Sequence, residues 1–135
     1  MQRIADTGLL VGLLDRLDSH HSWAIEQFEQ FSPFEVCEPV LSELAFILGD
    51  PRPGVRMLSL GDLNLSFSLA HHKERVLELL EKYRDLQMDL ADACIVRMTE
   101  LVDQCQVWTV DRADFRVYRR HGRQHIPCAF PSRGE

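Results

Sequence analysis

Two patterns of apolar and polar residues alternate along this chain, one typical of strands and one typical of helices. Short runs that are apolar throughout, or that alternate with polar residues, predict strands; they cover residues 3–5, 34–38, 63–68, 107–110 and 125–128. Between these runs, apolar residues recur every three or four positions, which predicts helices. The helical segments cover residues 9–17, 22–30, 39–48, 69–83 and 90–105, with a short helix or turn at 51–61.

Regular alternation of strands with helices is typical of a parallel sheet that carries helices on both faces. The pattern therefore predicts an α/β fold, a three-layer α/β/α sandwich with a short central parallel sheet. The segment 90–105 is apolar almost all round, so we expect it to be a central buried helix. At 135 residues without a repeat or a linker, we expect one domain over residues 1–130 and a loose tail at 131–135.

Composition narrows the class of protein. The longest apolar runs are too short to cross a membrane, and the first one has an acidic flank unlike a signal peptide, so we expect a cytoplasmic protein. The four cysteines lack metal-binding or disulfide spacing, which favours buried thiols.

The net charge of −6 does not by itself indicate nucleic-acid binding, but the charge is uneven. Residues 111–135 hold six arginines and three acidic residues, a net charge of +3, so the rest of the chain carries −9. A local basic patch can bind a polyanion even when the whole protein is acidic. Arg112, Arg116, Arg119 and Arg120 are therefore either contacts for an RNA backbone or part of a solvated charged face.

Acidic residues follow two of the predicted strands and begin or flank two of the helices. Asp6 ends the first strand, and a polar turn at 111–114, with Asp111 first and Asp114 last, follows the strand at 107–110. Glu43 lies on the flank of a helical apolar stripe, and Asp92 lies in the first turn of the central helix. Because ligands bind beyond the carboxyl ends of parallel strands, we expect these carboxylates to meet in one cleft.

Carboxylates gathered in one cleft repel one another unless a divalent cation neutralises them. Oxygen ligands select hard cations, so the sequence predicts Mg²⁺ or Mn²⁺. Such a cation acidifies a bound water and orients a phosphate, which is the chemistry of phosphodiester hydrolysis. Taken singly, each acid also has an ordinary explanation as a turn former, a helix cap or a solvated helix residue.

Two aspartates compete for the role of ligand at the start of the central helix. Asp89 precedes the apolar segment and suits the N-cap, where its side chain would accept backbone N–H groups. Asp92 would then be the third helical residue, at the positive end of the helix dipole, which favours the ionised form of a ligand. We therefore expect Asp92 to be the ligand and Asp89 to be the cap, although both lie on one side of the helix.

Four segments in this order resemble the motifs of the PIN domain, and more narrowly those of VapC-type toxins. They are IADTGLL at 4–10, EPVLSEL at 38–44, MDLADA at 88–93 and TVDRADF at 109–115. The resemblance spans nearly the whole chain and implies a Mg²⁺- or Mn²⁺-dependent endoribonuclease. It implies that the catalytic metal ligands are Asp6, Glu43, Asp92 and Asp111, with help from Asp114. Thr109 is expected to hydrogen-bond within the acidic site or to contact the RNA backbone.

The same resemblance implies two protein partners, a second copy in a homodimer and an antitoxin that blocks the cleft. The first two helices hold more apolar residues than one face needs, so some of them are either core or partner surface. These residues are Leu9, Leu13, Leu14, Trp23 and Phe28. Two other functions stay open: a catalytically silent PIN-fold module that binds nucleic acid or a partner, and a DNA nuclease, since no feature separates RNA from DNA.

Overall fold

Five parallel strands form the centre of the computed structural model, which describes residues 1–132. Their order across the sheet is β3-β2-β1-β4-β7, and every neighbouring pair is parallel. The strands are β1 (Gln2–Ala5), β2 (Phe34–Val36), β3 (Leu63–Leu65), β4 (Cys105–Trp108) and β7 (Cys128–Ala129). The two longest, β1 and β4, lie side by side in the interior, where backbone pairing is protected from water.

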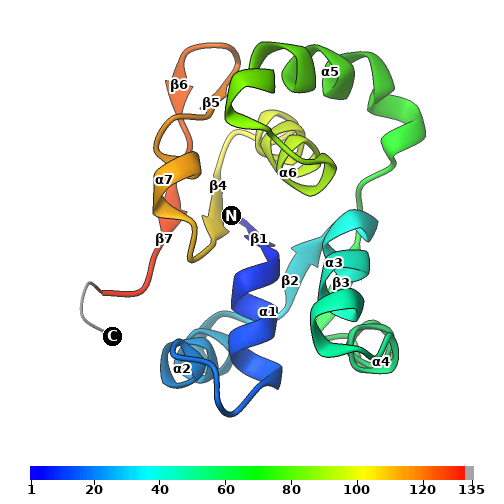
Figure 1. Cartoon of the computed structure of the whole chain (residues 1–135), viewed down its shortest axis with the longest axis vertical. Helices are drawn as coiled ribbons and strands as arrows, with labels where there is room; N and C mark the ends of the chain where they lie inside the picture. The colour runs from blue at the N-terminus through cyan, green and yellow to red at the C-terminus, as the bar shows by residue number, and fades with distance from the viewer. Residues whose placement is uncertain (133–135) are drawn as a thin grey trace.

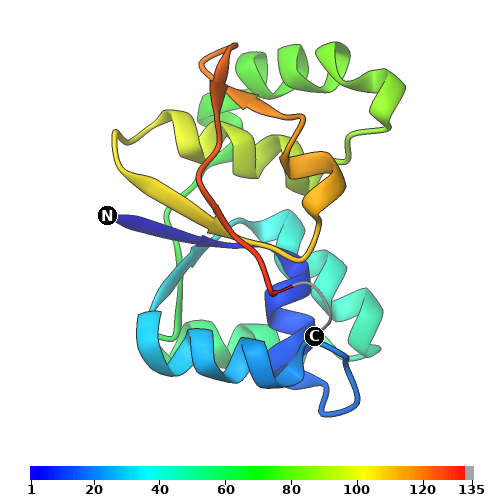
Figure 2. The same ribbon diagram turned by 90° about the vertical axis from the view of Figure 1, so that its left-hand side faces the viewer.

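Helices cover both faces of this sheet. They are α1 (Thr7–Leu14), α2 (His21–Phe31), α3 (Glu38–Leu48), α4 (Arg52–Leu60), α5 (Leu69–Lys82), the 3₁₀ helix η1 (Arg84–Leu86), α6 (Leu90–Glu100) and α7 (Arg112–Phe115). Figure 2 shows α1 and α2 on one side of β1 and β4, and α5 and α6 on the other. The predicted three-layer α/β/α sandwich with a central parallel sheet is therefore confirmed (Figure 1).

The core packs aromatic side chains on one face of the sheet. Trp108 of β4 meets the rings of Phe31 and Phe34 at centroid distances of 5.3 and 5.2 Å, and its Nε1 donates to Gln27 Oε1 at 2.7 Å. A buried indole needs such an acceptor for its N–H group. On the opposite face, the residues of α6 from Ala91 to Val96 are all buried, so the predicted central buried helix is confirmed.

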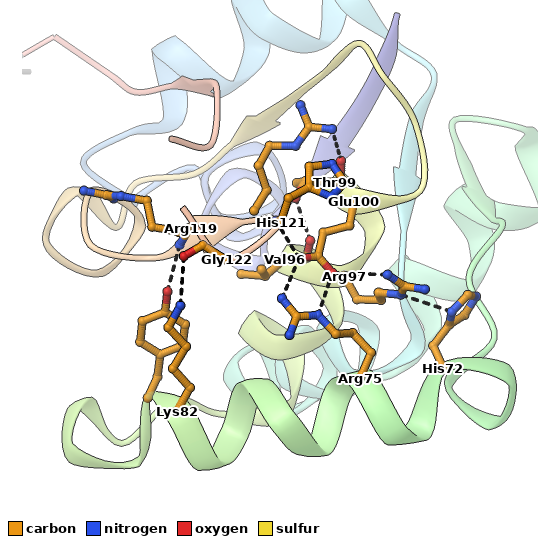
Figure 3. A network of polar contacts seen from close by, with 12 residues as sticks. His72, Arg75, Lys82, Val96, Arg97, Thr99, Glu100, Arg119, His121 and Gly122 are labelled. Atoms are coloured by element: carbon orange, nitrogen blue, oxygen red, sulfur yellow. Dashed lines mark hydrogen bonds and ion pairs between the residues drawn. The ribbon is translucent and has the colours of Figure 1, made fainter. Parts of the chain in front are cut away.

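A charged cluster holds α6 in place on its outer side (Figure 3). The Glu100 side chain, only 2% exposed, accepts from Arg75 of α5 at 2.9 and 2.7 Å and from Arg97 at 3.2 Å. It also accepts the backbone N–H of His121 at 2.8 Å, in the hairpin formed by β5 (Arg119–Arg120) and β6 (Gln124–His125). The far end of α6 is thereby tied to two other elements, which fixes the direction of the helix.

Most predicted boundaries differ from the observed ones by up to three residues, and three differences are larger or change the type of element. The central helix ends at Glu100 rather than at 105, because Cys105 pairs with Gln2 as the first residue of β4. The polar turn expected at 111–114 is the short helix α7, begun by the cap at Asp111. The strand expected at 125–128 is divided between β6, which pairs with β5, and β7, which pairs with β4.

The loose tail expected at 131–135 is wrong at its first residue. Pro131 is buried, and its carbonyl oxygen accepts a hydrogen bond from the Arg112 guanidinium. Residues 133–135 lie outside the described part of the chain. Among residues 1–132, no helix has the length and apolar character needed to span a membrane.

A candidate metal centre at the carboxyl edge of the sheet

The ends of β1 and β4 bring the first two polar groups of the site together. Ala5 and Trp108 are partners in the parallel ladder, and the Asp6 N–H donates to the Trp108 carbonyl at 2.9 Å. Beyond that pair, Thr109 Oγ1 donates to Asp6 Oδ2 at 2.7 Å and accepts from Asp111 N at 3.0 Å. Thr109 therefore hydrogen-bonds within the acidic site. Its side chain is fully buried, so the predicted contact with an RNA backbone is wrong.

Three carboxylates gather beside this pair of strand ends. Asp92, Asp111 and Asp114 each offer one oxygen atom, and the three atoms lie within 4.8 Å of one another. Asp111 is placed by its role as the N-cap of α7, where its Oδ1 accepts from Asp114 N at 3.0 Å. Residues that are about 20 positions apart in the sequence therefore converge because the first turns of α6 and α7 meet at one edge of the sheet.

The first turn of α6 has the predicted capping arrangement. Asp89 is the N-cap, and its Oδ1 accepts from Asp92 N at 2.8 Å. Asp92 is the third helical residue, with its carboxylate at the positive end of the helix dipole. Asp92 Oδ2 accepts a further hydrogen bond from Tyr118 Oη at 2.9 Å. The cap interpretation of Asp89 is confirmed by this geometry.

Glu43 reaches the site from α3 through a threonine. Thr7 Oγ1 donates to Glu43 Oε1 at 2.6 Å, while Thr7 N donates to Asp6 Oδ1 at 2.8 Å. Glu43 is not one of the three carboxylates that share a common centre.

The close approach of α1 to the end of β4 requires Gly8, because a Cβ at this position would collide with the side chain of Val110.

Burial and mutual repulsion raise the pKa values of four carboxyl groups of the site, those of Asp6, Glu43, Asp92 and Asp114. Burial raises the pKa of Asp6 to about 6, against the hydrogen bonds from Thr109 and Thr7, which favour the ionised form. Burial, then the charges of Asp6 and Asp89, raises the pKa of Asp92 to about 8. The same causes raise the pKa of Glu43, and burial with the charge of Asp111 raises that of Asp114.

No carboxyl group of the site forms an ion pair with a Lys, Arg or His side chain in residues 1–132. This holds for the five predicted ligands, which are Asp6, Glu43, Asp92, Asp111 and Asp114. Their excess negative charge therefore has two ways to be relieved, retention of protons or binding of a cation. All the donor atoms are carboxylate oxygens, and three of them share one small volume. Such a donor set fits a hard divalent cation such as Mg²⁺ or Mn²⁺.

Sequence reasoning missed three contributors to this site. Tyr118 gives no signal, because a tyrosine in a polar loop has no motif of its own. Thr7 adjoins Asp6, so its place at the start of α1 was visible, but its bond to Glu43 depends on how α1 and α3 pack. Asp89 was expected to act mainly as a cap, on the same side of the helix as Asp92, but its effect on the pKa values of Asp6, Glu43 and Asp92 was not predicted.

Of the four arginines predicted to contact RNA, one is contradicted by the structure and three are not. Arg120 is wrong as an RNA contact, because its buried guanidinium donates to the carbonyl oxygens of Thr99, Val102 and Asp103. Arg112 packs over the Phe130 ring at 4.8 Å. Arg119 donates to nearby backbone carbonyls, and Arg116 is exposed. RNA contacts by these last three arginines stay predictions.

Replacing the cap of α6 tests its contribution to stability. Asp89→Ala should lower the free energy of unfolding by about 0.5–2 kcal/mol, because the Asp92 N–H loses its acceptor. Asp89→Asn keeps an acceptor and removes only the charge, so its free energy of unfolding should stay close to the parent value. Urea unfolding followed by circular dichroism measures both. Equal losses in the two variants would show that charge, rather than capping, is what Asp89 contributes.

No model of a known protein family matches the chain, and no curated protein matches it. What the chain does must therefore follow from the chemistry of its own acidic cluster. That cluster offers three carboxylate oxygens within 4.8 Å of one another, a donor set that fits a hard divalent cation.

Proposed function

We propose that this chain is a Mg²⁺- or Mn²⁺-dependent endoribonuclease of the PIN type. The observation that carries the proposal is the group of three carboxylates, Asp92, Asp111 and Asp114, which converge without a basic partner in the described chain. Asp6 and Glu43 adjoin the group through the hydroxyls of Thr109 and Thr7. The resemblance of the four acidic motifs to those of PIN domains supports the same reaction.

In this proposal, Asp92, Asp111 and Asp114 hold the cation, and Asp6 stands next to them. When bound, the cation withdraws charge from the phosphodiester and acidifies a water. Thr109 keeps the Asp6 carboxylate in one orientation by donating to Oδ2, and the Thr7 N–H holds Oδ1. These two bonds make Asp6 a rigid neighbour of the reacting phosphate.

Glu43 stands where a substrate would enter. It lines a largely apolar groove of about 680 Å³ between α1 and α3, together with Thr7 and Val110. It also lines a second groove of about 520 Å³ that includes Asp89. A single-stranded nucleic acid lying along these grooves would bring a phosphate past Glu43 to the carboxylate group.

RNA cleavage is the direct test of this function. We expect the protein to cleave a single-stranded RNA with Mg²⁺ or Mn²⁺, to lose this activity in a chelator, and to leave the matched DNA intact. Asp6→Asn should lower the rate by orders of magnitude, because the anionic oxygen that Thr109 holds disappears. Asp85→Asn, at an exposed position on η1, is the matched control and should stay active.

The opposite results are equally informative. An Asp6→Asn protein as active as the parent would overturn the proposed site. RNA that is bound but not cleaved with either cation would favour the catalytically silent PIN-fold module. Cleavage of DNA alone would keep the metal chemistry and replace the substrate class.

A homodimer and an antitoxin stay predictions, and the structure changes where their contacts would lie. Leu9, Trp23 and Phe28 are buried, and Leu13 and Leu14 pack against the core, so these five residues belong to the fold. Exposed apolar side chains near α1 and on α3 include Leu17, Phe46 and Ile47, which are 94%, 89% and 57% exposed. Phe46 and Ile47 border the groove that ends at Glu43. An antitoxin there would present an apolar segment with a basic side chain toward the carboxylates.

A further inference from the structure

Tyr118 lies behind the acidic cluster in a stack of aromatic rings and has no part in the motifs described above. Its side chain is fully buried. Its ring meets those of Tyr83 and Phe115 edge to face, at centroid distances of 5.0 and 5.2 Å. The stack fixes the plane of the Tyr118 ring and hence the direction of its hydroxyl group.

Tyr118 contacts two of the three converging carboxylate residues, which come from different elements. Its Oη donates to Asp92 Oδ2 at 2.9 Å, and its backbone N–H donates to the carbonyl oxygen of Asp114 at 3.0 Å. One residue thus joins the first turn of α6 to α7. A buried phenol requires a hydrogen-bond partner, and here that partner is an oxygen of Asp92.

The contact limits how the Asp92 carboxylate can turn. Asp92 is itself only 8% exposed, so water has little access to compete for its oxygens. With Oδ2 held by Tyr118, rotation about the last side-chain bond would break a buried hydrogen bond. The carboxylate therefore keeps the orientation in which one of its oxygens faces Asp111 and Asp114.

We propose that Tyr118 is a positioning residue of the metal centre, whose hydroxyl holds Asp92 in the orientation that a divalent cation requires. The proposal rests on the metal site of the proposed function and deepens it. Groups that hold a ligand in place, without touching the metal, typically contribute about 10- to 100-fold to metal affinity. Tyr118 does not touch the cation or the substrate, so its effect is on affinity and geometry.

Calorimetric titration with Mn²⁺ alone tests the proposal without any nuclease substrate. Tyr118→Phe removes the hydroxyl and keeps the ring in its stack, and it should weaken Mn²⁺ binding by about 10- to 100-fold. Tyr83→Phe is the matched control, since its ring belongs to the same stack but its hydroxyl accepts from Arg119 N at 2.9 Å. Its Mn²⁺ affinity should equal that of the parent.

A spectroscopic signal keeps the test decisive even if Tyr118→Phe folds poorly. The chain has two tyrosines, so Tyr83→Phe leaves Tyr118 as its only phenol. Adding Mg²⁺, which has no absorption of its own, to Tyr83→Phe should produce a near-ultraviolet difference spectrum from the Tyr118 hydroxyl. A Tyr83→Phe protein that binds the cation without this change would overturn the proposal.

The outcomes separate this inference from the proposed function. If the parent binds Mn²⁺ and Tyr118→Phe binds it equally well, the positioning role is wrong and the metal centre stands. If the folded parent binds neither Mn²⁺ nor Mg²⁺, the metal centre and the role of Tyr118 both fail. Weakened binding in Tyr118→Phe supports the positioning role even if the parent cleaves no RNA.

Discussion

The Asp92→Asn substitution should abolish RNA cleavage while leaving the metal-free protein at least as stable as the parent. Asp92 supplies one of the three converging oxygens, and an amide oxygen carries no negative charge with which to hold a cation. The loss of activity should exceed the roughly 10- to 100-fold effect expected for a residue that only supports a ligand. Asp92→Asn should therefore separate the loss of activity from any loss of stability.

Stability is retained because of the state of the carboxyl group in the absence of a cation. Its pKa is raised to about 8, chiefly by burial, so at neutral pH the group is largely protonated in the folded protein. An asparagine has nearly the shape of a protonated aspartate. Its amide oxygen still accepts from Tyr118 Oη, so the hydrogen bond to the aromatic stack survives.

Two measurements on the same protein samples check this prediction. Cleavage rates are taken with saturating Mn²⁺, and thermal melts are recorded with a chelator present. Asp85→Asn, at an exposed position on η1 and outside the carboxylate cluster, should behave like the parent in both. Cleavage at the parent rate, or a melting temperature well below that of the parent, would contradict the assignment of Asp92.

The metal-free protein should lose stability as the pH rises from about 4 to about 8. The pKa of Asp6 is about 6 and that of Asp92 is about 8 in the folded state, against an ordinary value of 3.8. Across this window the folded state holds more protons than the unfolded state, so the free energy of unfolding falls with rising pH. Below about pH 4 both carboxyl groups are protonated and the loss of stability is absent, and above about pH 8 the loss is complete.

The size of this fall in the free energy of unfolding follows from how far the pKa values of Asp6 and Asp92 are raised. The change of about two units at Asp6 alone corresponds to about 3 kcal/mol, and Asp92 adds to it. A divalent cation should oppose the loss, because it binds the ionised carboxylates of the folded state. His72 acts in the opposite direction, because burial, and then the charge of Arg97, lowers its pKa.

Urea unfolding at about pH 5 and about pH 8 measures this dependence, with a chelator and with Mg²⁺. We expect a loss of about 3 kcal/mol or more in the chelator and a smaller loss with Mg²⁺. The Asp92→Asn variant retains the contribution of His72 and loses that of Asp92, so its loss with pH should be smaller than that of the parent. A free energy of unfolding that is flat or rises with pH in the chelator would contradict the proposed repulsion among the carboxylates.

Much of this architecture could be predicted from the sequence, because the determining signals are local. The period of apolar residues distinguishes strand from helix within a few positions, and the alternation of the two predicts a parallel sheet. The acids that follow β1 and β4 could be placed at one edge, because parallel strands end on the same side. The cap at Asp89 was visible because it depends only on the next three residues.

The remaining features depend on contacts between residues far apart in the chain, which no local pattern encodes. Thr109 binds Asp6 across 103 positions, and the same contact buries it away from any RNA. Arg120 looked like a surface cation until the fold placed the carbonyl oxygens at the end of α6 around it. The order of the strands, the end of α6 at Glu100 and the bond from Tyr118 to Asp92 were likewise decided by tertiary packing. Periodicity specifies which side of an element is buried, whereas the partner that buries it is chosen by the free energy of the whole assembled core.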